Sequence, residues 1–459
     1  MFALSPSFAE VELERVKDRH SILDREHYPC AFNAHDIEDT LRGIMDLRGK
    51  KVTVIGAARS GIAAANLVLR LGGIPKISDA KPLAEIETAL TGLKDRSRTI
   101  IEAGAHSREF VQDSDLVVAS PGVWKDAEPL AWARQKNIPV WGEIEFAWRF
   151  CTRPVIAVTG SNGKTTTVTL ITEVLKSAGK KPCLCGNVGV PFSQHVLDPD
   201  VDHFVIEISS FQLELIDLFR PRVAVLTNFS QNHLDRHPTM QDYFDAKRRL
   251  FKNQSPFDYA VLNFRDEWSC KIPGSIKSQV KLFNKEGESR NPNHLAVLEV
   301  SHIMGIADDL ALKVVDTFKG VEHRLEFVRS LDGVDYVNDS KSTTVEAGRW
   351  ALERASKTLV MIAGGSDKHM DYAPLKELVA QKVRVLVVMG AIREQLRGTF
   401  DGVVQVDVIS GGMQEALAHA RRVAHQGECV LLSPMTASFD MFDNFEHRGK
   451  VFKEIVNNL

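Results

Sequence analysis

Short apolar runs alternate with amphipathic stretches along most of the chain, beginning near residue 51. Residues 51–56 (KVTVIG) have the pattern of a buried strand that runs into a turn, and residues 62–73 (IAAANLVLRLGG) have that of a helix ending at two glycines. Because strands that alternate with helices form parallel sheets covered on both faces, the pattern predicts an α/β fold. Further strands are predicted at 75–79, 115–122, 155–160, 203–210, 222–228, 259–263, 358–365, 384–390 and 428–434.

The alternating pattern restarts twice, near residue 154 and near residue 321. A chain of 459 residues has room for about three domains of ordinary size. We therefore expect a first domain at 49–150, a central domain at 151–321 and a third domain at 322–459. Residues 1–48 are charged and lack a strand pattern, so they form an N-terminal extension of unassigned role.

The charge balance excludes binding to nucleic acid or to an anionic membrane through bulk charge. Lys and Arg number 57 against 60 Asp and Glu, which gives a formal charge of −3. Six cysteines in so long a chain do not make a disulfide framework, and the apolar runs are too short to cross a bilayer. The first 20 residues lack the basic and apolar regions of a secretory signal, so we expect a cytoplasmic protein.

The strongest local motif is VIAVTGSNGKTTT at 155–167, a strand followed by a glycine-rich turn and a helix. Gly160 and Gly163 allow the backbone to curl so that its N–H groups point at an anion, and Lys164 adds a cation for the terminal phosphates. Thr165 offers a hydroxyl to Mg²⁺, although Val158 stands where the general phosphate-loop pattern has its first glycine. The motif predicts a nucleoside triphosphate site whose contacts are Gly160, Ser161, Asn162, Gly163, Lys164, Thr165 and Thr166.

A second glycine motif, GAARSG at 56–61, follows the first predicted strand. Ala58 replaces the middle glycine of the dinucleotide-binding pattern, and Asp79 ends the next strand, where a ribose-binding acid would lie. Taken alone, the motif leaves open a nicotinamide-dependent oxidoreductase. A capping role for Asp79 in the turn is the structural alternative.

The phosphate loop in its shortened form, GSNGKTT, resembles that of the Mur ligase family, whose members join carboxylates to amino groups using ATP. Other stretches match in the same order from about residue 50 to the C-terminus: ARSG (58–61), SPGV (120–123), GNVGVP (186–191), EISSFQLE (207–214), TNFSQNHLDRH (227–237), AKRRLF (246–251), EHRLE (322–326), NDSKSTT (338–344), GGSDK (364–368) and LSPMTASFDMFDNFEHRG (432–449).

The resemblance implies three α/β domains, of which the first and third are Rossmann-like and the central one is a mononucleotide-binding sheet. It also implies an ATP-dependent ligase that acts through an acyl phosphate on UDP-N-acetylmuramoyl-L-alanine and D-glutamate, with two Mg²⁺ ions, as a monomer without nucleic-acid or membrane partners. A ligase of the same family with another amino-acid acceptor is the alternative. A nucleotide switch that hydrolyses ATP without an acceptor is a further one.

The resemblance assigns roles to individual residues of this sequence. Lys247 is expected to be carbamylated, so that an ammonium becomes an anionic oxygen ligand. Arg324 is expected to stabilise the transferring phosphate, and Lys341 to meet phosphate or the acyl intermediate. The expected catalytic residues are Lys164, His233, Lys247, Arg324 and Lys341, and the expected metal ligands are Thr165, Glu207, His233 and Lys247.

The remaining roles concern the ends of the substrates. Asn293 is a candidate adenine contact and Asp339 a candidate ribose contact. The candidate contacts to the uridine nucleotide substrate are Arg59, Ser60, Asp79, Gly122, Asn187 and Ser209. The candidate D-glutamate contacts are Thr343, Lys368, Ser438 and Phe445. Near them the sequence departs from the family pattern at Thr344, at GGSDK and at Phe439.

Overall fold

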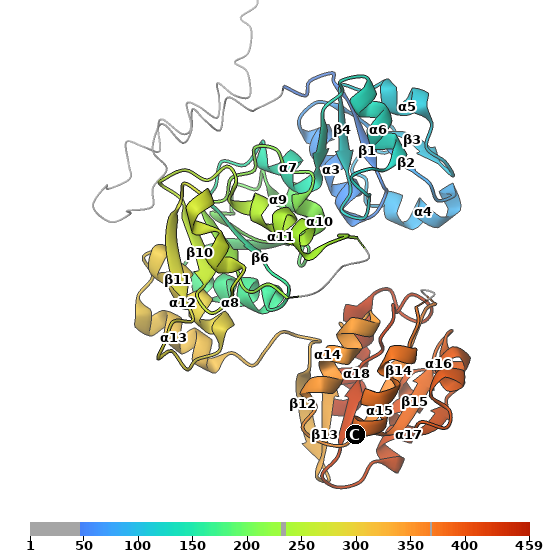
Figure 1. The fold of residues 1–459 in the computed structure, drawn as a ribbon. Coiled ribbons are helices and arrows are strands. Elements are labelled where there is room, and N and C mark those ends of the chain that lie inside the picture. The colour runs from blue at the N-terminus through green and yellow to red at the C-terminus, as the bar shows by residue number, and fades with distance from the viewer. Residues whose placement is uncertain (1–45, 231–235, 368–369) are drawn as a thin grey trace, which may run out of the picture. The chain divides into compact units, whose positions relative to one another are not determined.

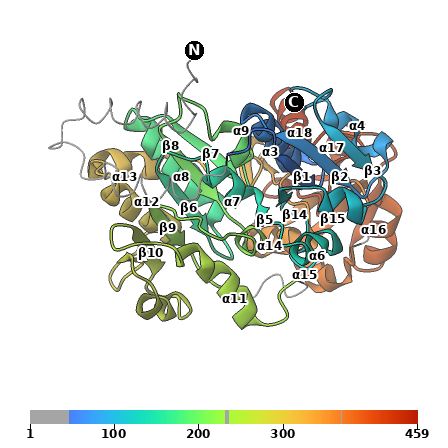
Figure 2. The same ribbon diagram turned by 90° about the horizontal axis from the view of Figure 1, so that it is seen from above.

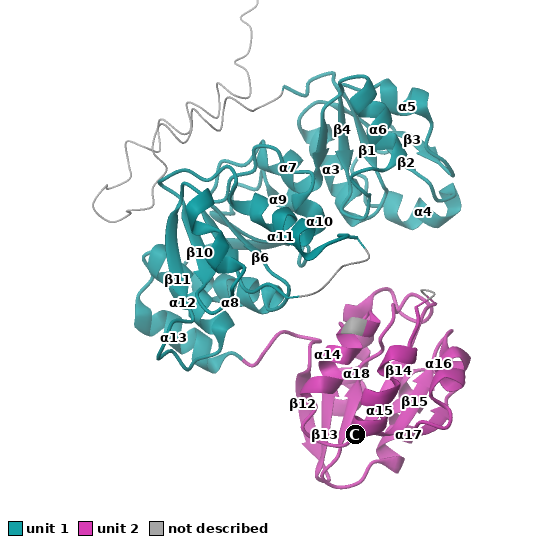
Figure 3. Ribbon diagram, in the orientation of Figure 1, with its two compact units in different colours: residues 1–318 teal, residues 319–459 magenta. Residues whose placement is uncertain are grey.

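The computed structural model of the protein describes residues 46–230, 236–367 and 370–459 (Figure 1). The chain divides after Phe318 into two compact units, which Figure 3 distinguishes by colour. Within the described residues, no helix combines the length and the apolar character needed to cross a membrane. Most of the predicted extension, residues 1–45, lies outside the described part.

The first sheet of unit 1 is parallel, in the order β3-β2-β1-β4-β5. Its central strands β1 and β4 are apolar and buried, as their sequences predict. The strands are β1 (Lys51–Ile55), β2 (Ile74–Asp79), β3 (Ile100–Ala103), β4 (Leu116–Ala119) and β5 (Val140–Gly142). The helices are α3 (Arg59–Arg70), α4 (Leu83–Leu90), α5 (Arg108–Gln112), α6 (Glu128–Gln135) and α7 (Glu143–Trp148).

The second sheet of unit 1 is also parallel, in the order β11-β10-β9-β6-β8-β7. Helix α8 packs against β6, β7 and β8, as Figure 2 shows. The strands are β6 (Val155–Thr159), β7 (Pro182–Gly186), β8 (His203–Glu207), β9 (Val223–Leu226), β10 (Tyr259–Asn263) and β11 (Gln279–Phe283). The helices are α8 (Lys164–Ser177), α9 (Phe192–His195), α10 (Ser210–Leu213), α11 (Met240–Arg248), α12 (Pro292–Ile303) and α13 (Asp308–Thr317).

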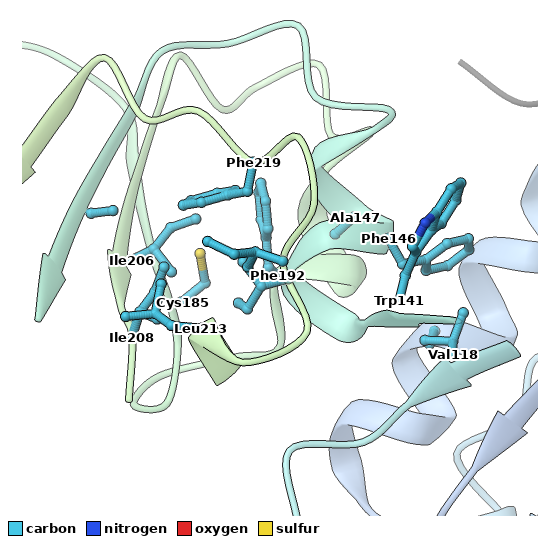
Figure 4. Close-up of a cluster of buried hydrophobic side chains, with 14 of the residues drawn as sticks. Val118, Trp141, Phe146, Ala147, Cys185, Phe192, Ile206, Ile208, Leu213 and Phe219 are labelled. Carbon is cyan, nitrogen blue, oxygen red and sulfur yellow. The ribbon is translucent and has the colours of Figure 1, made fainter. Parts of the chain in front are cut away.

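One hydrophobic core joins the two sheets of unit 1. Val118 and Trp141 of the first sheet belong to the same buried cluster as Phe146 of α7 and Phe192 and Phe219 of the central region (Figure 4). Helix α9 packs on both α3 and α7. Because burial of such aromatic surface is strongly favourable, this continuous core explains why the first two sheets form a single compact unit.

Unit 2 contains a mixed sheet in the order β12-β13-β17-β14-β15-β16. The strands β13, β17, β14, β15 and β16 pair parallel in this order, whereas β12 pairs with β13 antiparallel. The strands are β12 (Glu326–Leu331), β13 (Val334–Asn338), β14 (Leu359–Gly364), β15 (Val383–Met389), β16 (Gln405–Val408) and β17 (Cys429–Leu432). The helices are α14 (Val345–Arg354), α15 (Lys376–Lys382), α16 (Arg393–Phe400), α17 (Met413–Val423) and α18 (Phe445–Asn457).

The α/β fold class predicted from the sequence is confirmed, with one difference in unit 2. The sequence pattern predicted only parallel pairing, but β12 and β13 form an edge hairpin. Its two-residue turn is Asp332-Gly333, and both residues have positive φ (54° and 76°). Such a turn matches the twist of antiparallel strands, so this dipeptide between two apolar runs is the local cause of the hairpin.

Candidate active site

The phosphate loop connects β6 to α8 at the carboxyl edge of the central sheet. Gly160 and Gly163 have φ of 148° and 81°, which side chains disfavour. An added Cβ would overlap Thr227 Oγ1 at Gly160 and Asn293 Oδ1 at Gly163. Both positions therefore require glycine, and the following N-terminus of α8, without acidic residues in its first turn, favours an anion.

The loop is braced by polar residues that directly follow β9. Thr227 Oγ1 donates a hydrogen bond to the Asn162 carbonyl at 2.6 Å, and the Asn162 N–H donates to Asn228 Oδ1 at 3.0 Å. Ser161 Oγ donates to the Ser230 carbonyl at 2.9 Å. Thr227, Asn228 and Ser230 were not among the predicted site residues, although polar residues directly after an apolar strand are the signal that marks them.

Two lysines converge on the loop carbonyl of Gly160. Lys164 Nζ donates to it at 2.8 Å and also to the Ser161 carbonyl at 3.0 Å, while Lys247 Nζ donates to Gly160 at 3.0 Å. Lys247 comes from α11, is 1% exposed, and lies 4.6 Å from the centre of the Tyr243 ring. Lys247 is thus directed from α11 at the phosphate loop.

Burial lowers the pKa of Lys247. Desolvation, reinforced by the positive charge of Lys164 and opposed by Glu207, holds the pKa of Lys247 well below its ordinary value of 10.5. A neutral lysine amine is a nucleophile, whereas an ammonium is not. The site therefore shifts the equilibrium of this side chain toward the neutral, nucleophilic form.

The oxygen atoms of Thr165 and Glu207 lie together beside the loop. Glu207 ends β8 opposite Val158 of β6, and it is 3% exposed. Thr165 Oγ1 donates to Glu207 Oε2 and Asn187 Nδ2 donates to Glu207 Oε1, each at 2.7 Å. A hydroxyl and a carboxylate next to a phosphate loop are hard oxygen donors, so this set fits Mg²⁺.

The other residues expected at the ATP site are placed unevenly. Asn293, in the first turn of α12, lies beside Gly163, and Thr166 lies in the first turn of α8. His233, expected as a metal ligand and catalytic residue, lies outside the described residues, as does Lys368.

Four of the residues expected at the uridine nucleotide lie at or just after the carboxyl ends of β1, β2 and β4: Arg59, Ser60, Asp79 and Gly122. Asp79 accepts hydrogen bonds from the N–H groups of Ala57 (2.7 Å) and Lys81 (2.9 Å), which is the capping role that the sequence left open. Arg59 donates to the Gly189 carbonyl at 2.6 Å, and the space around Gly122 is open. Ser60 lies in the first turn of α3.

Ser209 and Asn187 come from the central sheet. The Ser209 side chain caps α10 in a reciprocal arrangement with Gln212, so its oxygen has a structural partner. Asn187 contacts Glu207, as described above. The geometry thus groups Asn187 with the Thr165–Glu207 pair.

In unit 2, the segment after β13 carries Asp339, Lys341 and Thr343. Asp339 is 3% exposed, and its two carboxylate oxygens accept hydrogen bonds from the Leu325 N–H (3.1 Å) and from Ser433 Oγ (2.9 Å). Burial raises the pKa of Asp339 to about 7. Asp339 thus joins three segments of unit 2, and the ribose contact stays a prediction.

A buried arginine that was not predicted from the sequence holds together the loops that carry Lys341 and Ser438. Arg448 of α18 is 1% exposed and donates to the carbonyls of Ser340 (2.9 Å) and Thr436 (3.1 Å). Burial lowers its pKa to about 10. Arg448 therefore fixes the loops that carry Lys341 and Ser438; Ser438 itself is buried, and Lys341 Nζ lies 6.0 Å from the centre of the Phe445 ring.

Three family models match the chain. The family model "Mur ligase middle domain" matches residues 158–317, "Mur ligase, glutamate ligase domain" matches 323–435, and "Mur ligase MurD-like, N-terminal domain" matches 50–142. The chain belongs to the Mur ligase family. The three Mur ligase models cover both sheets of unit 1 and most of unit 2.

Curated relatives and solved structures extend the comparison. Proteins of Koribacter versatilis and Pelotomaculum thermopropionicum, each named UDP-N-acetylmuramoylalanine–D-glutamate ligase, are 39% identical over 90% and 91% of this chain and 99% of their own lengths. The fold is similar to that of the UDP-N-acetylmuramate–alanine ligase of Thermotoga maritima (TM-score 0.54, 17% identity, 89% of this chain and 99% of that one). It is also similar to MurF of Acinetobacter baumannii (TM-score 0.52, 15% identity, 88% and 93%).

Proposed function

We propose that the protein is an ATP-dependent ligase that joins the carboxylate of UDP-N-acetylmuramoyl-L-alanine to the amino group of D-glutamate, a step in making peptidoglycan precursors. The observation that carries this proposal is the match, over nine-tenths of the chain, to relatives named for that activity. The geometry of the phosphate loop supports it, because Lys164, Lys247 and the Thr165–Glu207 pair surround one anion-binding turn.

The reaction has two steps. The substrate carboxylate attacks the γ-phosphorus of ATP, which gives an acyl phosphate and releases ADP. The amine then attacks the acyl carbon, and loss of phosphate and a proton leaves the amide. Since both steps concentrate negative charge, the N–H groups of the loop and Lys164 would stabilise the phosphates, and Arg324 would neutralise the transferring group.

Mg²⁺ would be held by Thr165 and Glu207, with His233 and a carbamylated Lys247 as ligands of a second ion. Bound Mg²⁺ supplies Lewis-acid neutralisation of the phosphate oxygens. The carbamate would form when the neutral Lys247 amine adds to CO₂ and loses one proton. Its support is the burial of Lys247, its position at the Gly160 carbonyl and its lowered pKa.

The substrate ends complete the proposal. Arg59, Ser60, Asp79, Gly122, Asn187 and Ser209 would serve the uridine nucleotide substrate, and Asn293 and Asp339 the adenosine. Thr343, Lys368, Ser438 and Phe445 would serve D-glutamate, with Lys341 at the phosphate or acyl intermediate. We further propose three domains divided near residues 150 and 321, and a cytoplasmic, monomeric enzyme.

The test is ADP release by the purified protein with ATP, Mg²⁺ and UDP-N-acetylmuramoyl-L-alanine, supplied with one amino acid at a time. We expect turnover with D-glutamate and none with L-glutamate or diaminopimelate. Turnover with only one of the latter would assign the chain to another acceptor. ADP release without any acceptor would indicate a nucleotide switch.

A further inference from the structure

The backbone around Arg324 is strained and is held in place by the segment after β13. His323 and Leu325, the two neighbours of Arg324, have left-handed φ of 63° and 44°. The His323 carbonyl accepts from the Lys341 N–H at 3.0 Å, and the Leu325 N–H donates to Asp339 Oδ1 at 3.1 Å. These contacts fix where the Arg324 side chain leaves the chain.

The His323 side chain adds a further restraint. It is buried, and Asn338 Nδ2 lies 2.9 Å from its Nδ1 and 3.0 Å from Glu326 Oε2. An added Cβ at Gly449 of α18 would overlap the His323 ring, so the helix packs closely on it. The strained turn is therefore clamped from two directions.

Beyond the backbone, the Arg324 guanidinium lies over an indole ring. The Arg324 guanidinium carbon lies 4.6 Å from the centre of the Trp350 ring, and that of Arg354, one turn further along α14, lies 4.1 Å from it. An indole face attracts a guanidinium at this separation, so the half-buried ring favours this position of the Arg324 side chain.

We propose that Trp350 is a positioning residue, which holds the guanidinium of Arg324 in the orientation used on the transferring phosphate. The inference rests on the proposed function, because it assigns to Arg324 the stabilisation of that phosphate. Preset orientation matters for the rate because an arginine that is already ordered loses little freedom when charge develops in the transition state.

The test is a double-mutant cycle in the full-length enzyme, using Trp350→Leu, Arg324→Met and the double variant. We expect Trp350→Leu to lower kcat about two- to fivefold with the KM for D-glutamate unchanged. In the Arg324→Met background, the same substitution should change nothing, since there is no guanidinium to position. An equal fall of kcat in both backgrounds would show a merely structural role and overturn the proposal.

Two further variants keep the result decisive. Trp350→Phe retains an aromatic face and should keep a kcat near that of the wild-type enzyme. This variant also tests the proposal if Trp350→Leu fails to fold. Arg354→Met removes the other cation from the same ring and should leave kcat unchanged. A loss of kcat with Arg354→Met equal to that of Trp350→Leu would overturn the assignment to Arg324.

The contact itself has a readout that is independent of activity. Trp350 is the one tryptophan in the sequence from 319 to 459, so the difference between wild-type and Trp350→Phe emission reports on it. We expect the same difference, measured between Arg324→Met and the double variant Arg324→Met/Trp350→Phe, to differ from that of the wild-type pair. An identical difference spectrum would overturn the proposal. If Arg324→Met retains full activity with D-glutamate, the role proposed for Arg324 is wrong and the ligase assignment stands. If the wild-type enzyme releases no ADP, the proposed function itself is wrong.

Discussion

Burial shifts the pKa of Lys247 in unit 1 and of Asp339 in unit 2 toward the neutral form, with different consequences. In unit 1, Lys247 is surrounded by the neutral oxygens of Gly160 and Thr159 and has a strongly lowered pKa. In unit 2, Asp339 accepts two hydrogen bonds, and its pKa is raised to about 7. Burial therefore shifts an amine at the phosphate loop toward its neutral form, whereas in unit 2 it acts on a carboxyl group that ties loops together.

The largest expected effect tests whether the loop in unit 1 binds the triphosphate. Lys164→Ala should lower ADP release about 100- to 1,000-fold, because it removes the cation nearest the developing charge. Lys176→Ala, in the last turn of the same helix and paired with Glu173 at the surface, is the matched control and should leave the rate unchanged. Equal rates for both variants would refute a phosphate-binding role for Lys164.

The next effect tests whether the buried lysine carries a carbamate. Lys247→Ala should lose about 100-fold in rate, and acetate or another short carboxylate should restore part of it by replacing the missing oxygens. Removing CO₂ from the buffer should slow the wild-type enzyme, and bicarbonate should reverse the loss. The exposed Lys252→Ala variant is the control. Full activity of Lys247→Ala without any added carboxylate would exclude the role.

Two glycines with similar backbone conformation separate strain from crowding at the loop. Gly163 and Gly179 have φ of 81° and 73°, but an added Cβ overlaps Asn293 only at Gly163, while the space at Gly179 is open. Alanine at either position should lower the free energy of unfolding by about 1 kcal/mol. Only Gly163→Ala should also raise the KM for ATP, by roughly tenfold. Equal KM values would mean that Asn293 and the loop do not act together.

The phosphate loop could be predicted because all its determinants are contiguous in sequence. A buried strand, two glycines and a lysine define it locally, and the strand-ending Glu207 is found by topology. The central apolar strands were predicted for the same reason. Strands β3, β7, β11, β12 and β16 were missed because they are only partly buried and lack a clear apolar run. The three-residue strand β5 and the strand β13 were missed as well.

Residues whose role depends on distant segments could not be predicted in this way. Asp339 meets Leu325 and Ser433, and Arg448 meets carbonyls of two other loops. Such hydrogen bonds exist only once the sheet has brought the loops together, so sequence spacing does not reveal them. The β12–β13 hairpin differs, because its Asp-Gly turn is a local signal that the sequence analysis overlooked.

The smallest expected effect tests the buried acid in unit 2. Between its unfolded pKa near 4 and its folded pKa of about 7, Asp339 holds its proton in the native state but not in the unfolded one. The free energy of unfolding should therefore fall as pH rises through this window, by at least about 1 kcal/mol. Asp339→Asn keeps an acceptor for Leu325 but cannot ionise, so its stability relative to wild-type should increase from pH 4.5 to pH 7.

The stability of Asp339→Asn relative to wild-type is measured by urea unfolding of the full-length proteins. The contribution of Trp350 to the tryptophan fluorescence reports on unit 2. Asp335→Asn is the matched control: its hydrogen bond from Lys357 lowers the pKa of Asp335, so its titration lies below the window. The stability difference between Asp335→Asn and wild-type should stay constant from pH 4.5 to pH 7. If the stability difference between Asp339→Asn and wild-type also stays constant with pH, the carboxyl group of Asp339 ionises without cost in the folded wild-type protein. The proposed effect of burial on Asp339 would then be wrong.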